Sequence, residues 1–330
     1  MQFSFTDEQN MIRESVANAC EELCDREALF KAMEDKGGFH REAWQTLCAE
    51  MGLGLTAVPE DRDGLGLGII ELASIVEKMG RTLLPTPFFT SIVLSTSALI
   101  HGERSETFDA ILTEVACGEK IASFAFLDAQ AKNSAQSGAA TYGKDNTVSG
   151  NLSFAQYADE ADYLIVLAQN ADGTPCLCVI DTKADGVTIT PRLNMDMTRP
   201  ICDISLGNAA VIDGAPLTSD ATVIERVFNI ARICLASEQL GASEAILEKT
   251  RAYTLERHQF GRAIGSFQAV KHRLACRTPV LGQNAHRCKC GLGFTRAAFA
   301  HKGETFAARH VKGHPFDYPN AVIGDVHICQ

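Results

Sequence analysis

The chain has 330 residues, with 41 acidic against 30 basic side chains and a net charge of −11 at pH 7, and its length suits about two domains of ordinary size. An acidic chain of this kind disfavours nucleic acid and anionic membranes as partners, because both require clustered lysine and arginine. No apolar run approaches the ~18 residues of a membrane-spanning helix, and the first residues lack the pattern of a signal peptide. We therefore expect a cytoplasmic protein with reduced cysteines.

Residues 1–118 are predicted to form an N-terminal helical domain. Thr6 followed by Gln9 has the pattern of a capping box, and apolar residues then recur at helical spacing. Two further helices are expected to end at Gly52 and Gly80, because glycine commonly terminates a helix. The two remaining helical stretches of this domain are expected at 91–101 and 105–116.

Residues 119–215 are predicted to form a small antiparallel β domain, because short β-branched and aromatic runs alternate there with turn-forming residues. The expected strands lie at 121–126, 147–154, 163–168, 177–180, 187–190 and 204–206. From Ser219, a reasonable N-cap, helical spacing resumes, so 216–275 are predicted to begin a C-terminal helical domain. The fold class is therefore α+β, in the order helical, β, helical.

The segment 276–330 is atypical. It holds five of the nine His and four of the twelve Cys, with seven basic side chains against three acidic ones, and its prolines and glycines interrupt any helical period. One hypothesis is a shifted reading frame from residue 276, since codons for Asp-Val-Ala read two bases later give Cys-Arg, the pair at Cys276 and Arg277. A divergent natural tail is the alternative.

The string from Arg257 to Gln268, RHQFGRAIGSFQ, resembles the R-x-Q-F-G-x-x-I-x-x-F-Q signature of acyl-CoA dehydrogenases. Stretches at 5–13, 58–67 and 77–85 resemble the helical domain of members grouped with steroid side-chain degradation, and weaker matches continue through the β domain. The resemblance covers residues 1–275. It implies an acyl-CoA dehydrogenase-like fold whose C-terminal helical domain is incomplete here.

The resemblance also implies a function and a set of site residues. Family members oxidise the Cα–Cβ bond of an acyl-CoA thioester with FAD, pass the electrons to a further acceptor, and assemble as homo- or hetero-oligomers. By resemblance, Arg257 is the cofactor residue at the FAD pyrophosphate, Phe260 and Gln268 are weaker cofactor-binding candidates, and Arg232 is a substrate-binding candidate. A guanidinium fork suits paired phosphate oxygens, although a solvated helix-end cation is the alternative interpretation of Arg257.

Two departures from the family pattern concern the site itself. The family's T-E-P-x-x-G-S-D loop is replaced by residues 126–133, FLDAQAKN, which lack the proline and the Gly-Ser pair. The family's catalytic glutamate would stand on the long helix at Ala231 or in a later Y-E-G-T-like segment that does not occur after 275. Because alanine cannot accept a proton, no catalytic residue is assigned; Glu225 lies on another face of the helix, and Glu238 lies two turns away.

Three functions remain open on this basis. The first is an FAD-dependent acyl-CoA dehydrogenase acting on a bulky, steroid-derived thioester, and the second is a non-catalytic or truncated subunit of a heteromeric enzyme. The third is a helical scaffold without flavin. No metal is expected, because the cluster at 286–290 is too tightly spaced for a zinc site, and the Gly64-x-Gly66-x-Gly68 run is expected to be a loop that enters a helix.

Overall fold

The structure, a computed structural model, describes residues 4–34 and 38–277 and the two short strands β10 (Val322–Ile323) and β11 (Val326–His327). The remainder of the atypical tail, with the cluster at 286–290, lies outside the described residues. The chain forms two compact units: residues 1–75 with 83–231, and residues 76–82 with 232 onwards.

The first unit begins with helices, and its first helix confirms the predicted capping box. Thr6 Oγ1 accepts the backbone N–H of Gln9, and the Gln9 side chain accepts the backbone N–H of Thr6. Gly52 has φ +67° and follows the helix that it was expected to end. The helices of this region are α1 (Asp7–Leu23), α2 (Arg26–Glu34), α3 (Arg41–Gln45), η1 (Thr46–Glu50), η2 (Leu53–Leu55), η3 (Glu60–Arg62), α4 (Ile69–Thr82), η4 (Phe89–Thr96), α5 (Ser97–His101) and α6 (Glu106–Ala116).

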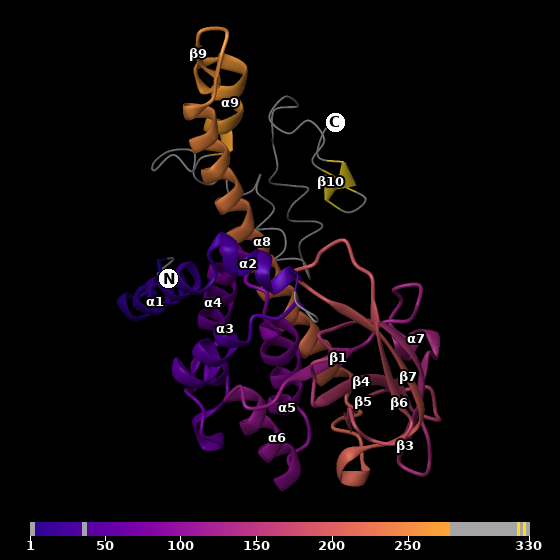
Figure 1. Cartoon of the computed structure of the whole chain (residues 1–330). Coiled ribbons are helices and arrows are strands. Elements are labelled where there is room, and N and C mark those ends of the chain that lie inside the picture. Colours follow the sequence, from indigo (N-terminus) through magenta and orange to yellow (C-terminus); the bar gives the residue numbers. More distant parts are fainter. Residues whose placement is uncertain (1–3, 35–37, 278–321, 324–325, 328–330) are drawn as a thin grey trace. The chain divides into compact units, whose positions relative to one another are not determined.

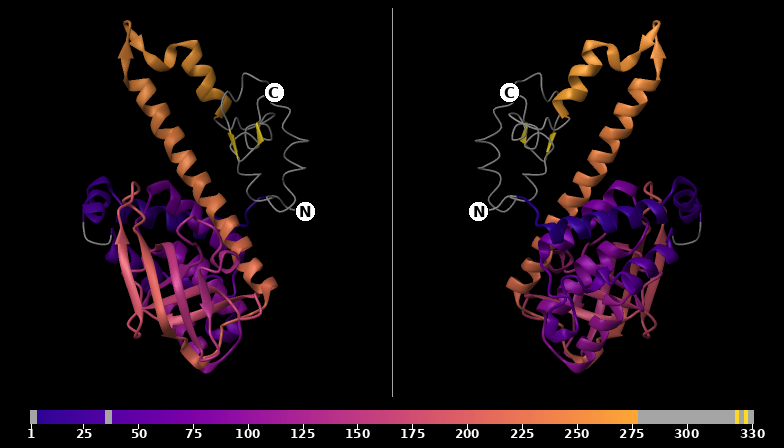
Figure 2. Two further views of the ribbon diagram at one scale, coloured as in Figure 1. Left: turned by 90° about the vertical axis from the view of Figure 1, so that its right-hand side faces the viewer. Right: turned by 90° about the vertical axis from the view of Figure 1, so that its left-hand side faces the viewer.

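A seven-stranded sheet completes the first unit, and Figures 1 and 2 show that it curls. Its order is β1-β4-β2-β3-β7-β6, with β5 paired to β4. Most pairs are antiparallel as predicted, but β1 and β2 each run parallel to β4, so the sheet is mixed. The short strand β2 was not predicted. The bounds are β1 (Ala122–Ala125), α7 (Ser134–Ser137), β2 (Ala140–Tyr142), β3 (Thr147–Gln156), β4 (Tyr163–Gln169), β5 (Pro175–Asp181), β6 (Val187–Arg192), β7 (Ile201–Ala210) and η5 (Ile212–Gly214).

Helix η4 covers the outer edge of strand β1 with side-chain hydroxyls. Ser91 Oγ donates to the carbonyl of Ala122 at 2.7 Å and accepts the N–H of the same residue at 3.0 Å. Thr90 Oγ1 accepts the N–H of Phe124 at 2.9 Å. These bonds satisfy backbone groups that an uncovered strand edge would leave unpaired, and they fix β1 against η4.

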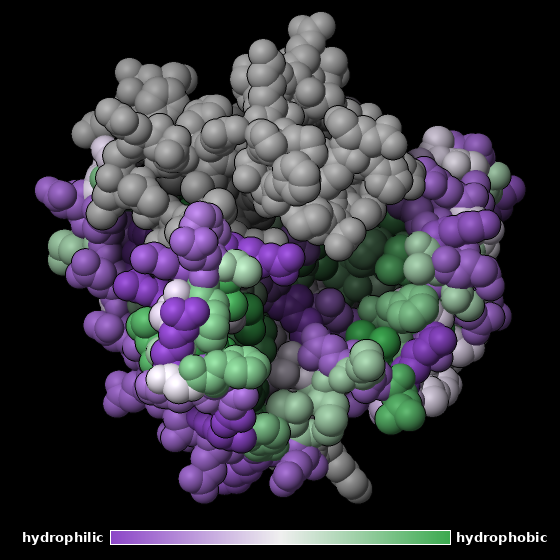
Figure 3. Space-filling view, turned by 90° about the horizontal axis from the view of Figure 1, so that it is seen from above, coloured by the Kyte–Doolittle hydropathy of each residue, from purple (hydrophilic) through white to green (hydrophobic). Residues whose placement is uncertain are grey.

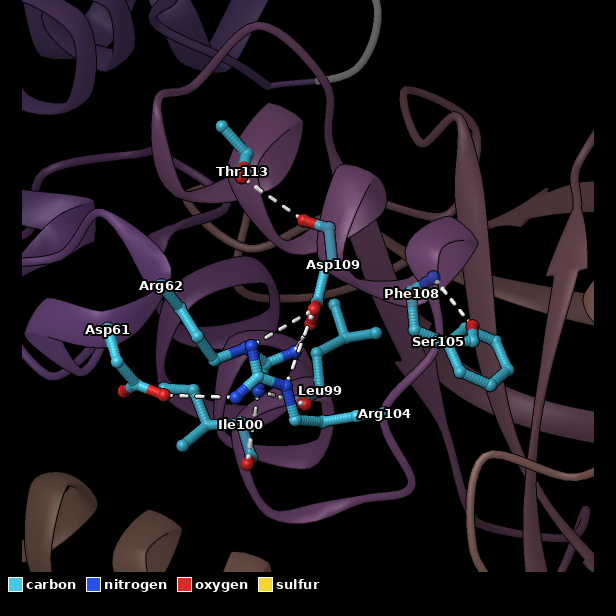
Figure 4. A network of polar contacts seen from close by, with 9 residues as sticks. All are labelled: Asp61, Arg62, Leu99, Ile100, Arg104, Ser105, Phe108, Asp109 and Thr113. Atoms are coloured by element: carbon cyan, nitrogen blue, oxygen red, sulfur yellow. Dashed lines mark hydrogen bonds and ion pairs between the residues drawn. The ribbon is translucent and has the colours of Figure 1, made fainter.

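A buried arginine ties η3 to α5 and α6 (Figure 4). Arg62 donates to the carbonyls of Leu99 and Ile100 at the end of α5, at 3.0 and 3.2 Å, and forms an ion pair with Asp109 on α6. The exposed Arg104 pairs with Asp61 and with the same Asp109. Because helix-terminal carbonyls lack partners within the helix, Arg62 acts as a cap for α5.

In the second unit, glycines allow α4 and α8 to cross at backbone contact. A Cβ added to Gly80 would lie 2.3 Å from the carbonyl oxygen of Glu238, and one added to Gly241 would lie 1.8 Å from that of Glu77. The prediction that α4 ends at Gly80 is therefore wrong, because this glycine provides a close approach inside a helix that continues to Thr82. The remaining elements are α8 (Ala221–Glu256), β8 (His258–Gln259), β9 (Arg262–Ala263), η6 (Ile264–Ser266) and α9 (Gln268–Arg277).

Candidate cofactor and substrate site

The first turns of α8 carry the position at which the sequence lacks a base. The helix begins at Ala221, and Asp220 Oδ1 accepts the N–H of Thr222 at 2.8 Å, so the cap is Asp220 and not the expected Ser219. Ala231 is 8% exposed and lies on the same side of the helix as Val227 and Phe228, four and three residues earlier. Glu225 is exposed and Glu238 is half-buried. The face around Ala231 therefore carries apolar side chains and offers no carboxylate from within the same turn.

Three phenylalanines meet beside this part of α8. The rings of Phe126 and Phe228 have centroids 5.2 Å apart, and Phe124 lies 5.9 and 6.0 Å from the two. Phe124 is buried, whereas Phe126 and Phe228 are half-buried. Residues two apart in a strand share a side, so the sequence could have paired Phe124 with Phe126, but nothing in the sequence pattern connects them to Phe228. The cluster was not predicted.

The loop that follows β1 uses its own side chains to satisfy its backbone. Asp128 Oδ1 accepts the N–H groups of Gln130 and Lys132 at 2.8 and 2.9 Å. Asn133 Oδ1 accepts those of Ala135 and Gln136 at 3.0 and 3.3 Å. The bond from the Lys132 N–H, and secondarily that from Gln130, hold the pKa of Asp128 below its usual range. Because these donors are already bonded, the loop offers few of the backbone contacts that the family's glycine-serine loop is expected to provide.

In the second unit, α8 ends in an exposed hairpin that carries the predicted cofactor residues. Arg257 is exposed and follows the last helical residue, and its carbonyl accepts the N–H of Ile264 at 2.8 Å. The turn between β8 and β9 places Phe260 at φ +53° and Gly261 at φ +74°. Phe260 is 92% exposed, with its ring edge-on to Phe267 at 6.2 Å. A bulky residue held at positive φ is strained, and strain of this kind concentrates at functional positions.

Two of the three candidates, Arg257 and Phe260, lie at the hairpin, and the third, Gln268, is exposed at the start of α9, next to Phe267. Arg262 lies over the ring of Phe267 at 4.1 Å from its centroid. Arg232, the substrate candidate, is exposed on α8, 25 residues before Arg257 and about 37 Å away along the helix axis. Within one chain, Arg232 and Arg257 are therefore too far apart to contact the same phosphate or other small chemical group.

Other kinds of site receive no support in the described part of the chain. Among residues 4–34 and 38–277, no group of three or more His, Cys, Asp or Glu is placed to hold a metal ion. No helix described is both long enough and apolar enough to cross a membrane. Cys20, Cys24 and Cys234 are buried as expected, and burial raises the pKa of each thiol, which is consistent with a packing role.

Comparison with known proteins shows to which family this chain belongs. The family model for the N-terminal domain of acyl-CoA dehydrogenases matches residues 6–119, and that for the C-terminal domain matches residues 221–277. Acyl-CoA dehydrogenase IpdE2 of Mycolicibacterium smegmatis is 33% identical over 270 residues, which are 82% of this chain and 72% of the relative. The chain belongs to the acyl-CoA dehydrogenase family. The resemblance drawn from the sequence is thereby confirmed.

Further relatives support the same family. IpdE2 of Mycobacterium tuberculosis is 30% identical, over 82% of this chain and 70% of its own length. Butyryl-CoA dehydrogenase of Megasphaera elsdenii has the same fold, with a TM-score of 0.75 at 20% identity over 92% of this chain and 82% of its own. The ChsE4-ChsE5 complex of M. tuberculosis gives 0.79 at 23% identity, over 92% and 80%. The α+β fold with helical, β and helical regions is thus confirmed.

Proposed function

We propose that this acyl-CoA dehydrogenase binds FAD and an acyl-CoA thioester and takes part in α,β-dehydrogenation of the acyl group. The observation that carries the proposal is membership of the family, together with the exposed Arg257 and Phe260 at the hairpin and the exposed Gln268 at the start of α9. Within this proposal the domain limits stay as the sequence predicts them: an N-terminal helical domain at 1–118, a β domain at 119–215 and the start of a C-terminal helical domain at 216–275.

The hairpin fits a dinucleotide. An exposed guanidinium at Arg257 suits a diphosphate, and the exposed ring of Phe260 offers an apolar face beside it. Gln268 supplies both a donor and an acceptor. Bound FAD would supply the two-electron acceptor that protein side chains lack. The loop at 126–133 does not add to this fit, because Asp128 already accepts the N–H groups of Gln130 and Lys132, and Asn133 accepts those of Ala135 and Gln136 in α7.

Ala231 favours a second, more specific role, that of a subunit which binds FAD and substrate but supplies no base. A proton acceptor has to stand within hydrogen-bond reach of the α-carbon proton, and the methyl group of Ala231 cannot act as one. The heteromeric assembly named for the ChsE4-ChsE5 structure is a precedent for two related chains that act together. In this role the base comes from a partner chain of the same family, and the electrons pass to a separate acceptor.

Adding acyl-CoA to the purified, flavin-loaded chain separates the two roles. Bleaching of the flavin absorbance by the chain alone supports a complete dehydrogenase. A perturbed but unbleached flavin spectrum supports the subunit role, and it predicts that bleaching appears only with a partner chain. A chain that retains FAD but shows no response to any acyl-CoA, alone or with a partner, would refute both.

A further inference from the structure

Two cysteines of β5 lie in contact inside the sheet. Cys176 and Cys178 are both fully buried, and their Sγ atoms are 4.0 Å apart. They stand two residues apart in a strand, so both side chains project from the same face of the sheet. The Cys176 Sγ also lies 3.7 Å from the carbonyl oxygen of Ala168 on β4. The fold therefore holds two thiols together in the core before any reaction takes place.

The residue between the two thiols anchors the segment that leads into α8. The N–H of Leu177 donates to the carbonyl of Thr218 at 2.9 Å, and the carbonyl of Leu177 accepts the N–H of Leu217 at 2.7 Å. Thr218 Oγ1 accepts the N–H of Asp220 at 3.1 Å, and Asp220 is the cap of α8. A change in the backbone of β5 at the two cysteines is thus passed on to the start of α8.

A disulfide between the two thiols is within reach, but it requires the strand to shorten. Two steps along a strand cover about 6.4–6.8 Å, which is close to the upper limit of about 6.8 Å between the Cα atoms of a disulfide. The sulfur atoms have to approach from 4.0 Å to about 2.05 Å. The backbone around Leu177 therefore has to move when the bond forms.

The two thiols differ in reactivity. The contact with Cys178 lowers the pKa of the Cys176 thiol, whereas the contact with Cys176, and secondarily burial, raise the pKa of Cys178. Because the thiolate is the nucleophile, Cys176 is the thiol that reacts first. β5 is paired with β4 along one side and bonded to the 217–218 segment through Leu177 on the other. Local opening at this margin of the sheet admits a small oxidant.

We propose that Cys176 and Cys178 are a redox modification site, at which hydrogen peroxide forms a reversible disulfide within β5 that loosens the start of α8. In the first step the Cys176 thiolate attacks a peroxide oxygen, so that an S–O bond forms, the O–O bond breaks and one water leaves after protonation. In the second step the Cys178 sulfur attacks the sulfenic acid, the S–S bond forms and a second water leaves. Two thiols are oxidised and one peroxide is reduced. A small thiol reductant reverses the change by thiol–disulfide exchange. The proposal involves neither FAD nor a thioester, so its failure leaves the proposed function untouched.

Trypsin places both cysteines on one peptide, residues 145–183, which contains no other cysteine. The folded 330-residue chain is treated with hydrogen peroxide, its remaining thiols are blocked with N-ethylmaleimide during unfolding, and this peptide is measured by mass spectrometry. The peptide should carry no blocking group and should be lighter than the dithiol by two hydrogen atoms. Treatment with dithiothreitol before blocking should restore the doubly blocked peptide.

Variants and hydrogen exchange test the two halves of the proposal. Cys178→Ala should abolish the disulfide in this peptide, whereas Cys202→Ala, which removes another buried thiol of the same core, should leave its formation unchanged. In the oxidised chain the amides of Leu177 and Leu217 should exchange several-fold faster than in the reduced chain. The amides that pair β6 with β7 are the internal reference, and their exchange should not change.

Several results would overturn the proposal. If the peptide stays doubly blocked after a peroxide treatment that oxidises the half-buried Cys117, the two thiols serve packing alone. A peptide that gains oxygen atoms without losing its hydrogens also contradicts the disulfide. If the disulfide forms and the exchange of Leu177 and Leu217 stays the same, the link to α8 is wrong. Should Cys178→Ala not fold, the peptide from the unmodified chain still decides, because its mass alone reports the bond.

Discussion

Gly241 on α8 lies against the backbone of Glu77 on α4, so closely that a Cβ at position 241 would stand 1.8 Å from the Glu77 carbonyl oxygen. Both helices would have to shift to admit a side chain, and overpacking of this kind costs about 1–3 kcal/mol or more. Gly241→Ala should therefore lower the free energy of unfolding by at least about 2 kcal/mol in urea denaturation. Gly207→Ala is the control, because its nearest neighbour would be 3.9 Å away. Equal stability of the two variants would contradict this account of the crossing.

The Arg62 network predicts unequal effects for two arginines that share one carboxylate. Arg62 is buried and caps α5, whereas Arg104 is exposed, although both pair with Asp109. Arg62→Met should lower the free energy of unfolding by about 1–3 kcal/mol, because it leaves the carbonyls of Leu99 and Ile100 unpaired, whereas Asp109 keeps Arg104 as a partner. Arg104→Met should cost less than about 1 kcal/mol. Chemical denaturation of both variants measures the difference, and a larger loss for Arg104 would contradict the assignment of Arg62 as the cap.

Because His101 is partly buried, the folded chain should lose stability in mild acid. Burial, and secondarily the charges of Arg226 and Arg62, lower the pKa of His101 below its ordinary value of 6.5. The unfolded chain then binds a proton near pH 6.5 that the folded chain does not, so the contribution is complete above that pH and falls as the pH falls below it. Unfolding experiments at pH 7.5 and pH 5.5 should show a smaller decrease in stability for His101→Gln than for the unmodified chain. Identical decreases would show that His101 is not buried among these charges.

A single substitution at Ala231 should give the isolated chain dehydrogenase activity. In Ala231→Glu, a carboxylate stands where the family places a base, and octanoyl-CoA should then bleach the flavin of the isolated chain. Because Val227 and Phe228 share this face of the helix, the apolar surroundings should raise the pKa of the new carboxyl, so the rate should increase with pH. Ala231→Gln has nearly the same shape without the ability to accept a proton and should remain inactive. Equal rates for the two variants would refute the role of position 231.

Replacing Phe260 with glycine should weaken cofactor binding without lowering the stability of the fold. Phe260→Gly removes the strain of a bulky residue at φ +53°, worth about 1 kcal/mol, and the lost ring is almost fully exposed. The melting temperature should be unchanged or higher, while the affinity for FAD should decrease several-fold. A variant that is destabilised and still binds FAD normally would show that the ring serves the packing of the hairpin.

Local patterns in the sequence predicted most of the elements, because their causes are local. The capping box at Thr6 and Gln9, the left-handed Gly52 and the alternating strands each depend on a few neighbouring residues. The errors have non-local causes. Gly80 looks like a helix terminator until α8 is brought against it, and the parallel pairing of β1 with β4 depends on the path of the chain between them.

The candidate site was predictable to the extent that a continuous motif carries it. Arg257, Phe260 and Gln268 lie within twelve residues of one string, and the structure places them on one hairpin and the helix that follows it. The Phe124, Phe126 and Phe228 cluster joins residues about a hundred positions apart, which periodicity cannot connect. The hydroxyls of η4 that hold β1 were likewise not predicted, since serine and threonine within an apolar helix give no signal of their partners.

Figure 3 shows a face of the molecule on which hydrophobic side chains lie among hydrophilic ones. The exposed large apolar residues include Leu193, Met195 and Phe260. Extensive exposed apolar surface promotes association. Binding experiments with the purified chain should therefore be preceded by a test that it is monodisperse.

The uptake of FAD by the 330-residue chain tests the central claim most directly. The folded, monodisperse protein should retain added FAD through gel filtration, with visible flavin absorbance that Arg257→Met reduces strongly and Arg104→Met does not. A well-folded chain that emerges colourless, or one whose flavin content is the same in both variants and in the unmodified protein, would contradict the assignment of the Arg257 hairpin as the cofactor site.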